Sequence, residues 1–339
     1  MISQAIAMIT EGERLNREEA RELMLCIMRG EASDAQIASL LTALKMRGET
    51  ADEIAGFAEG MRASAVNIQP SVSPLVDTCG TGGDGQGTFN VSTAAAFIVA
   101  GAGIPVAKHG NRGVSSRCGS ADVLEALGVN IDMEPEMVRE CIEEVGIGFL
   151  FAPKFHPAMR HVMRARREMG IPTAFNLLGP LANPAGARVQ LLGVARKDKA
   201  PLLARAMAEM GVQRAMVVHG EDGLDEISTC APTLFWEVEN GGLKEGLLDP
   251  RQLGLPPADK AALLGGDASF NASIIRDEVL AGKRGPRRDI AVLNAAAALV
   301  LCGAAPGLEE GLAAAENSID TGEALRKLED MVSFSRKGG

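Results

Sequence analysis

Aromatic residues are scarce in this chain of 339 residues, which contains ten Phe, one Trp and no Tyr. Because single-stranded nucleic acids are commonly bound by stacking on aromatic side chains, recognition of that kind is disfavoured. An excess of basic residues is also lacking, since the formal net charge is −10. General binding to nucleic acids or to anionic membranes calls for a basic surface, so we expect neither partner.

Cysteine pairs and long hydrophobic runs are lacking as well. The six cysteines are widely spaced without a CxxC pair, and reduced thiols in the cytoplasm are the simplest interpretation. The longest apolar runs, such as 94–106, are too short and too interrupted to span a bilayer. The first ten residues lack the basic segment of a secretory signal. We therefore expect a cytoplasmic protein, and its 46% of hydrophobic residues can form a sizeable core.

Three capping boxes predict that residues 1–70 form a small helical domain. In each box a short polar residue can cap the first turn of a helix, and a Glu or Gln three positions later can reach back. The pairs are Asn16 with Glu19, Ser33 with Gln36, and Thr50 with Glu53. Gly30 and Gly48 follow at positions where a left-handed residue commonly ends a helix.

Beyond residue 70 short apolar runs alternate with longer helical segments. Strands are predicted at 75–77, 104–107, 189–192 and 215–218. Helices are predicted at 92–100, 120–127, 135–145 and 289–301. Alternation of this kind is typical of an α/β domain in which helices cover both faces of a mostly parallel sheet.

The segment 77–93 contains a cluster of glycines between a predicted strand and a predicted helix. Gly80, Gly82, Gly83, Gly85 and Gly87 leave the backbone free to turn its amides toward an anion. The helix that follows adds unpaired amides and the positive end of its dipole. Asn90, Ser92 and Thr93 stand at its first turn, where they can cap the helix and contact a ligand. The alternative is a flexible surface turn.

A basic segment, 108–116, follows the next predicted strand. It combines Lys108, His109, Asn111, Arg112 and two serines within nine residues. Lysine and arginine can neutralise phosphate charge, and hydroxyl groups can donate to phosphate oxygens. The alternative is a solvated basic loop. For His109 a structural hydrogen bond and a direct ligand contact are both open.

Two adjacent carboxylates, Asp225 and Glu226, lie in a glycine-containing loop after the strand predicted at 215–218. Magnesium usually binds proteins through one or two carboxylates together with substrate phosphates. Ser92 could add a hydroxyl oxygen from the glycine segment. Adjacent acids are also common on surfaces, but ligands of open α/β sheets sit at the carboxyl ends of the strands. We therefore expect the three loops to converge on one cleft that can bind phosphate groups and magnesium.

Four motifs together resemble the anthranilate phosphoribosyltransferase family, namely DTCGTGGD at 77–84, NVST at 90–93, KHGNR at 108–112 and GLDE at 223–226. Segments 151–160 and 176–184 extend the resemblance to nearly the whole chain. The resemblance implies a fold of the nucleoside phosphorylase and phosphoribosyltransferase type. A helical domain of residues 1–70, completed by about 166–184, would stand beside a large α/β domain of 74–165 and 185–339. It also implies a homodimer through the helical domain.

The resemblance further implies transfer of the phosphoribosyl group from phosphoribosyl pyrophosphate to the amine of anthranilate, in tryptophan biosynthesis. Two magnesium ions per chain would be held by Ser92, Asp225 and Glu226. Anthranilate would contact Gly80, Asn111 and Arg166, a member of the basic run 164–167. Lys108 would act electrostatically, and no general base is assigned. The phosphoribosyl pyrophosphate site would comprise Gly80, Gly83, Asp84, Thr88, Asn90, Val91, Ser92, Thr93, Lys108, His109, Gly110, Asn111, Arg112, Gly113, Ser115, Ser116 and Ser120.

Two other functions compete with this interpretation. A pyrimidine nucleoside phosphorylase of related fold would transfer the sugar to phosphate, but Asn111, Arg166 and the acidic pair favour anthranilate. A non-catalytic paralogue that binds nucleic acid would need a broad basic face. The net charge of −10 and the intact pair of Asp225 and Glu226 oppose it.

Overall fold

The small N-terminal domain is helical, as the capping boxes predict. The structure is a computed structural model that describes residues 1–113 and 117–337. All three boxes are formed, with both the side-chain and the backbone hydrogen bond present in each. The four helices are α1 (Ile2–Thr10), α2 (Arg17–Met28), α3 (Asp34–Arg47) and α4 (Ala51–Ala63).

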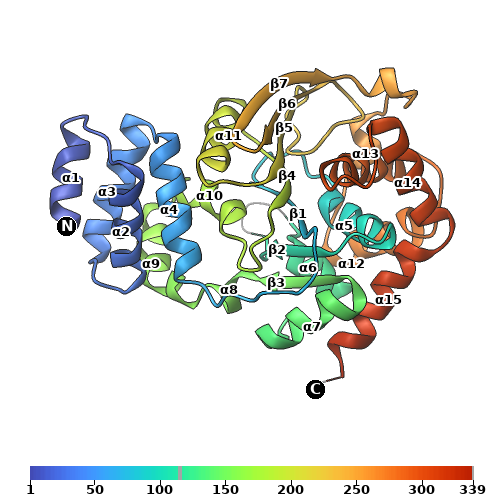
Figure 1. Ribbon diagram of the computed structural model, residues 1–339, viewed down its shortest axis with the longest axis horizontal. Coiled ribbons are helices and arrows are strands. Elements are labelled where there is room, and N and C mark those ends of the chain that lie inside the picture. The colour runs from blue at the N-terminus through green and yellow to red at the C-terminus, as the bar shows by residue number, and fades with distance from the viewer. Residues whose placement is uncertain (114–116, 338–339) are drawn as a thin grey trace.

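A later segment of the chain returns to this domain. It carries α8 (Ala152–Phe155), α9 (Arg160–Met169) and α10 (Phe175–Leu178). Helix α9 packs on α2 and α3, and α10 packs on α4. In Figure 1 α9 and α10 lie beside the N-terminal helices, whereas α8 lies next to β3. The returning helix α9 thus begins at Arg160, a few residues before the position of about 166 that we expected.

The large domain is built on one sheet, in which the described residues contribute seven strands in the order β3-β2-β1-β4-β5-β6-β7. Pairing is parallel from β3 through β5 and antiparallel for β6 and β7. The strands predicted from the sequence correspond to β1, β2, β4 and β5. The bounds are β1 (Val76–Gly80), β2 (Val106–Gly110), β3 (Ile147–Phe151), β4 (Val189–Gly193), β5 (Arg214–Gly220), β6 (Thr233–Glu239) and β7 (Gly242–Leu248).

Strands β6 and β7 were not predicted from the sequence, although the residues between them are typical of a hairpin turn. The turn between them consists of Asn240 and Gly241, with φ of 48° and 81°. An Asn-Gly pair with positive φ at both positions is the preferred two-residue hairpin turn. Strand β3 was missed because its short apolar run directly follows α7 (Pro135–Val145), and periodicity alone cannot separate such a run from the helix end.

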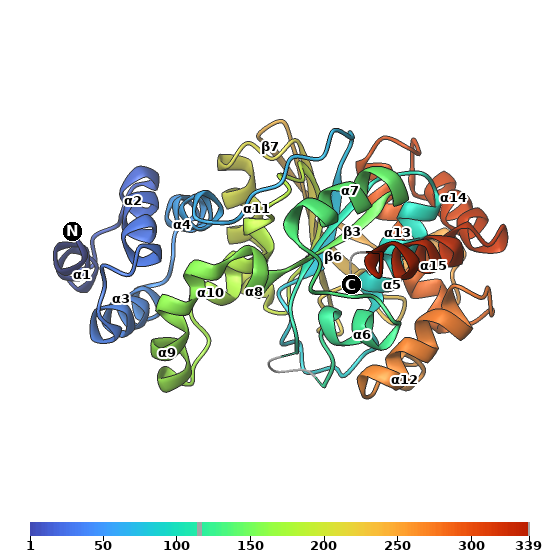
Figure 2. The same ribbon diagram turned by 90° about the horizontal axis from the view of Figure 1, so that it is seen from below.

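Helices cover both faces of the sheet (Figure 2). On one face α5 packs against α13 and α15, and on the other α11 packs against β5, β6 and helix α4 of the small domain. The apolar cores of the small domain and of that second face are therefore continuous. The remaining helices are α5 (Val91–Gly101), α6 (Ser120–Ala126), α7 (Pro135–Val145), α11 (Ala200–Glu209), α12 (Ala268–Ser273), α13 (Pro286–Leu301), α14 (Leu308–Asp320) and α15 (Glu323–Ser335).

The order of the strands brings the predicted loops together. Strands β2, β1, β4 and β5 are consecutive and parallel, so their carboxyl ends lie at one edge of the sheet. The glycine segment, the basic segment and the acidic loop leave three of these ends, and the fourth is Gly193 of β4.

Candidate active site

The glycine segment forms a backbone turn whose conformation favours glycine at most of its glycine positions. Gly82, Gly83, Gly85 and Gly87 have φ between 64° and 79°, a left-handed conformation that favours glycine. Gly80 is needed for a different reason, because a Cβ there would lie 2.6 Å from Oδ2 of Asp225. The sequence of this loop is therefore explained by its path and by its close approach to the acidic loop.

Two hydrogen bonds join the glycine segment to the acidic loop. The amide of Gly82 donates to Oδ2 of Asp225 at 2.8 Å. The amide of Ser92, in the first turn of α5, donates to Oε1 of Glu226 at 3.1 Å. The two loops, separated by more than 130 residues in the chain, therefore meet at the positive end of α5.

Lys108 lies beneath this junction rather than on its surface. Its side chain is 3% exposed, and its Nζ donates to the carbonyl of Thr78 at 2.7 Å and to Oγ of Ser92 at 3.3 Å. Burial lowers the pKa of Lys108, while the charges of Asp77 and Glu226 act to raise it. The ammonium group thus contributes positive charge under the loops and orients the Ser92 hydroxyl.

The carboxyl groups of Asp84, Asp225 and Glu226 lie close together without an ion pair to Lys or Arg in the described ranges. Burial, and next the charge of Asp84, raise the pKa of Asp225 to about 7. Burial and the charge of Asp225 raise the pKa of Glu226 well above its usual value. Oδ2 of Asp84 is buried without a hydrogen-bond partner. No Lys or Arg forms an ion pair with these three residues within 1–113 and 117–337. Those ranges contain no group of three or more His, Cys, Asp or Glu side chains that could hold a metal ion by themselves, so a cation bound by Asp225 and Glu226 would take further oxygen ligands from a substrate.

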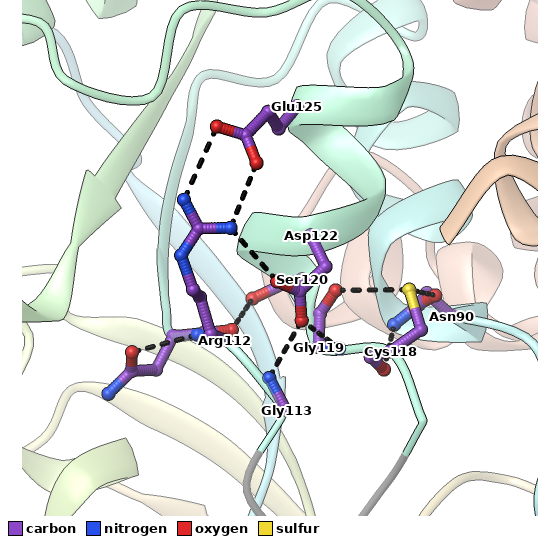
Figure 3. Close-up of polar contacts among 9 residues, drawn as sticks. Asn90, Arg112, Gly113, Cys118, Gly119, Ser120, Asp122 and Glu125 are labelled. Carbon is purple, nitrogen blue, oxygen red and sulfur yellow. Dashed lines mark hydrogen bonds and ion pairs between the residues drawn. The ribbon is translucent and has the colours of Figure 1, made fainter. Parts of the chain in front are cut away.

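The basic segment leaves β2 and packs on helix α6 (Figure 3). Arg112 forms ion pairs with Asp122 at 3.0 Å and with Glu125 at 2.8 Å. The hydroxyl of Ser120 donates to the carbonyl of Asn111 at 3.4 Å. Gly110 and Gly113 flank Asn111 and Arg112 in the described part of this loop. Ser115 and Ser116 lie outside the described residues.

His109 belongs to the protein interior. Its ring is 5.0 Å from the ring of His156, centre to centre, and both side chains are buried. Burial, and next the neighbouring His156, lower the pKa of His109 to about 3. The backbone amide of His109 also donates to Oδ1 of Asp77 at 3.4 Å. These contacts favour a structural role for a neutral ring, one of the two roles that the sequence left open.

Asn90 precedes α5 but does not cap it with its side chain, so that expectation was wrong. Its Nδ2 donates to the carbonyl of Cys118 at 3.2 Å, and its Oδ1 accepts from Nδ2 of Asn271 at 3.0 Å. Asn90 therefore links the glycine segment to two distant parts of the chain.

Other predicted residues of the glycine segment lie close to Asn90. Val91 and Thr93 are buried, and Thr88 forms an isolated β-bridge with Leu264.

Arg166 lies on α9, in the part of the chain that returns to the helical domain. Its guanidinium lies over the ring of Phe175, with Cζ 5.2 Å from the ring centre. Burial lowers the pKa of Arg166. Neighbouring Arg164 is exposed and pairs with Glu168 and Asp34. No hydrogen bond or ion pair in the described ranges joins Arg166 to the loops of the sheet edge.

Several residues that support the site were not among the site residues predicted from the sequence. Asn183 donates from Nδ2 to Oδ2 of Asp77 at 2.8 Å and to the carbonyl of Ala107 at 2.9 Å. It fixes β1 and β2 below Lys108. Gly193 and Asn271 support the acidic and glycine loops from positions remote in sequence. Only the location of Gly193 at the end of a predicted strand could have drawn attention to it.

Comparison with known proteins gives the same two-part division. Residues 3–65 match the helical bundle domain of a glycosyl transferase family, and residues 72–325 match the a/b domain of that family. The chain is 55% identical over 335 residues to the anthranilate phosphoribosyltransferase of Pelotomaculum thermopropionicum, which covers 99% of this chain and 97% of the relative. This chain belongs to the anthranilate phosphoribosyltransferase family.

Solved structures of the family have the same fold. The enzyme of Thermus thermophilus superposes with a TM-score of 0.93 at 46% identity, covering 98% of this chain and 99% of that one. The enzyme of Saccharomyces cerevisiae, in a complex with phosphoribosyl pyrophosphate and magnesium, gives a TM-score of 0.90 at 30% identity, with 98% and 97% covered. The fold predicted from the sequence, a helical domain beside an α/β domain with a mostly parallel sheet, is confirmed.

Proposed function

We propose that this chain transfers the 5-phosphoribosyl group from phosphoribosyl pyrophosphate to the amine of anthranilate and releases pyrophosphate, a step of tryptophan biosynthesis. The observation that carries the proposal is the junction of Gly82 with Asp225 and of Ser92 with Glu226 above the buried Lys108. This junction provides amides, a helix N-terminus and carboxylates for a metal-complexed pyrophosphate. The family of the chain supplies the substrates that such a site would serve.

The acidic loop would hold magnesium through Asp225 and Glu226, with Oγ of Ser92 as a further oxygen ligand. We infer two ions per chain, the number that the family resemblance implies, with Asp225 and Glu226 of one loop as their carboxylate ligands. Bound magnesium would neutralise the negative charge that develops on the departing pyrophosphate.

The reaction needs little from the protein beyond position and charge. The amine nitrogen of anthranilate forms a bond to C1 of the ribose while the bond from C1 to the pyrophosphate oxygen breaks. Loop amides and the charge of Lys108 stabilise the leaving group, and positioning aligns the amine with C1. The amine carries its own lone pair and loses its proton after the attack, so no general base is required.

Anthranilate fluorescence provides the direct test of this function. Anthranilate fluorescence should be lost when the protein is mixed with anthranilate, phosphoribosyl pyrophosphate and magnesium, and it should persist when the protein, the phosphoribosyl pyrophosphate or the magnesium is omitted. Release of free base from thymidine and phosphate would instead support the competing nucleoside phosphorylase. Persistent anthranilate fluorescence in the complete mixture would contradict the proposal.

Arg166 is proposed to bind the carboxylate of anthranilate, together with Asn111 and the backbone at Gly80. Its partly buried guanidinium has no carboxylate partner within the described ranges, and a guanidinium fork can bind two carboxylate oxygens. Arg166→Ala should raise the KM for anthranilate roughly 30-fold, the effect of losing a charge-assisted hydrogen bond.

Arg164→Ala provides the matched control for that measurement. Arg164 lies on the same helix, but its exposed side chain already pairs with Glu168, so its loss should leave both KM values nearly unchanged. Steady-state kinetics with each substrate varied in turn separates the two. A larger rise in the KM for phosphoribosyl pyrophosphate than for anthranilate in Arg166→Ala would show that Arg166 is wrongly assigned.

The helical domain is proposed to form a homodimer. Helix α3 contacts α1 and α9, and this layer exposes large apolar side chains, with Met46 84% and Met163 44% exposed. Ile171, directly after α9, is 44% exposed. Apolar side chains grouped on one face commonly mark a protein interface.

Met46→Glu combined with Met163→Glu should convert a dimer into monomers, because two charges would be buried at the proposed interface. Sedimentation velocity measures the change. Phe270→Glu is the control, since Phe270 is similarly exposed but lies on α12 of the large domain. A wild-type monomer, or a double variant that remains dimeric, would contradict the proposal.

We also propose that the protein works in the cytoplasm. Cys26, Cys79 and Cys141 are buried thiols rather than disulfides, as is usual in a reducing compartment. Among the described residues no helix is both long and apolar enough to cross a bilayer.

A further inference from the structure

Asp122, on helix α6, joins the two described ends of the loop that follows β2. Its Oδ2 accepts from the amide of Gly113 at 2.8 Å and from the amide of Gly119 at 2.9 Å. Its Oδ1 accepts from Nη1 of Arg112 at 3.0 Å. Figure 3 shows these bonds converging on one carboxylate. The bond to Gly119 is an ordinary helix-capping contact, whereas the bond to Gly113 spans nine residues.

The backbone around this carboxylate is packed too closely for any residue but glycine at position 119. A Cβ on Gly119 would lie 2.3 Å from the nitrogen of Gly113 and 2.5 Å from the carbonyl oxygen of Asn111. The amide of Ala121 donates to that same carbonyl at 3.2 Å. The two ends of the loop are thus in direct backbone contact, and both amides point toward one oxygen of Asp122.

This contact reaches the proposed substrate site on both sides. On one side Gly113 directly follows Asn111 and Arg112. On the other side Gly119 follows Cys118, whose carbonyl accepts from Nδ2 of Asn90 in the glycine segment. A shift of Gly119 would therefore move the acceptor that holds Asn90.

The charge state of Asp122 suits this role. Burial acts to raise its pKa, but the amides of Gly113 and Gly119 and the charge of Arg112 together hold the pKa below its usual value. The group is therefore ionised at neutral pH. Hydrogen bonds to a charged acceptor are roughly twice as strong as those between neutral groups.

We propose that Asp122 is a positioning residue for phosphoribosyl transfer, because its carboxylate fixes Gly113 against Gly119 and thereby pre-organises the basic and glycine segments. The inference rests on the function proposed above. This role requires no contact between Asp122 and the reacting atoms. It acts through the backbone that carries Asn111 and through the carbonyl that holds Asn90.

Glu125 offers a matched control on the same helix. It also accepts from the guanidinium of Arg112, at 2.8 and 3.3 Å, but it accepts from no backbone amide of the loop in the described residues. Glu125→Gln should therefore weaken the hold on Arg112 while leaving the contact between Gly113 and Gly119 intact. Asp122→Ala likewise weakens the hold on Arg112 and in addition removes the acceptor of the two amides, whereas Asp122→Asn keeps one oxygen that can accept from them.

Kinetics should separate these variants. Asp122→Ala should raise the KM for phosphoribosyl pyrophosphate about tenfold with a smaller change in kcat, since pre-organisation of the binding loops is lost. Asp122→Asn should recover most of the loss, and Glu125→Gln should stay within about twofold of the wild type. Equal effects of Asp122→Ala and Glu125→Gln would overturn the proposal, because Asp122 would then act through Arg112 alone.

Hydrogen exchange tests the same contact without relying on activity. The amides in peptides that cover 108–113 and 117–121 should exchange faster in Asp122→Ala than in the wild type. In Glu125→Gln the same peptides should exchange at the wild-type rate. If Asp122→Ala does not fold, Gly119→Ala serves instead, since its Cβ must separate Gly119 from Gly113. Unchanged exchange in these peptides would overturn the positioning role, whereas an inactive wild type with the expected exchange pattern would contradict only the proposed function.

Discussion

Turnover is expected to fall by about three orders of magnitude when Asp225→Asn and Glu226→Gln are combined, because the loss of electrostatic stabilisation at a leaving group has effects of this size. The two substitutions keep the shape of the side chains and remove both charges. The loss should be measured as kcat at saturating substrate and physiological magnesium. Kinetics like those of the wild type would contradict the metal assignment.

The same double variant should be at least as stable as the wild type in the absence of metal. Burial raises the pKa of both carboxyl groups, so each binds its proton more tightly in the fold than in the unfolded chain. At pH 8 both groups are ionised in the unfolded chain, so the raised pKa values in the fold lower the folding stability of the wild type at that pH. Thermal unfolding at pH 8 without metal checks this expectation, and a marked loss of stability would indicate that the pair has a structural role instead.

Ligand-induced stabilisation separates the two roles further. Magnesium with pyrophosphate should raise the Tm of the wild type, since a ligand that binds only the folded state stabilises it, but should leave the double variant nearly unchanged. Glu221→Gln is the control within the same loop, because Glu221 is exposed and its nearest cation, Lys197, is 4.0 Å away. Its Tm shift and its turnover should match those of the wild type.

Features that depend on neighbouring residues were predictable from the sequence. The capping boxes that begin at Asn16, Ser33 and Thr50 all form, because each is decided within one helical turn. The glycine segment also lies between a strand and a helix as predicted. Its positive φ values explain why glycine recurs there.

Features that depend on tertiary packing were not predictable. Asn271 stands 181 positions after Asn90 and contacts it from helix α12, a position that no local pattern indicates. Lys108 was expected to act on the leaving group through its charge, but nothing in the sequence indicates that it is 3% exposed and bonded to Thr78 and Ser92. The position of this lysine after a predicted strand indicated that it lies near the site. That its ammonium group lies below the loops follows only from the tertiary structure.

The contact between Gly193 and the acidic loop also depends on tertiary packing. Gly193 ends β4, and its carbonyl accepts from the amide of Thr81 at 2.9 Å. A Cβ on Gly193 would lie 1.6 Å from the carbonyl oxygen of Asp225 and 2.4 Å from the carbonyl carbon. These atoms are backbone, so no side-chain rotation can relieve the overlap.

Gly193→Ala should therefore displace Asp225 without changing any polar side chain. Because a displacement of about 1 Å at a catalytic group can cost 100-fold in rate, we expect kcat/KM to fall by about two orders of magnitude. Overpacking should also lower the free energy of unfolding by about 1–3 kcal/mol. Denaturant unfolding and steady-state kinetics measure the two effects on the same preparation.

Gly179→Ala tests whether the effect comes from this contact or from any glycine replacement near the site. A Cβ on Gly179 would meet nothing within 4 Å, and its φ of −50° suits any residue, so activity and stability should stay near wild type. An active Gly193→Ala would mean that β4 and the acidic loop can separate without loss of function. The close approach of Gly193 to Asp225 would then not be what positions the carboxylates for magnesium.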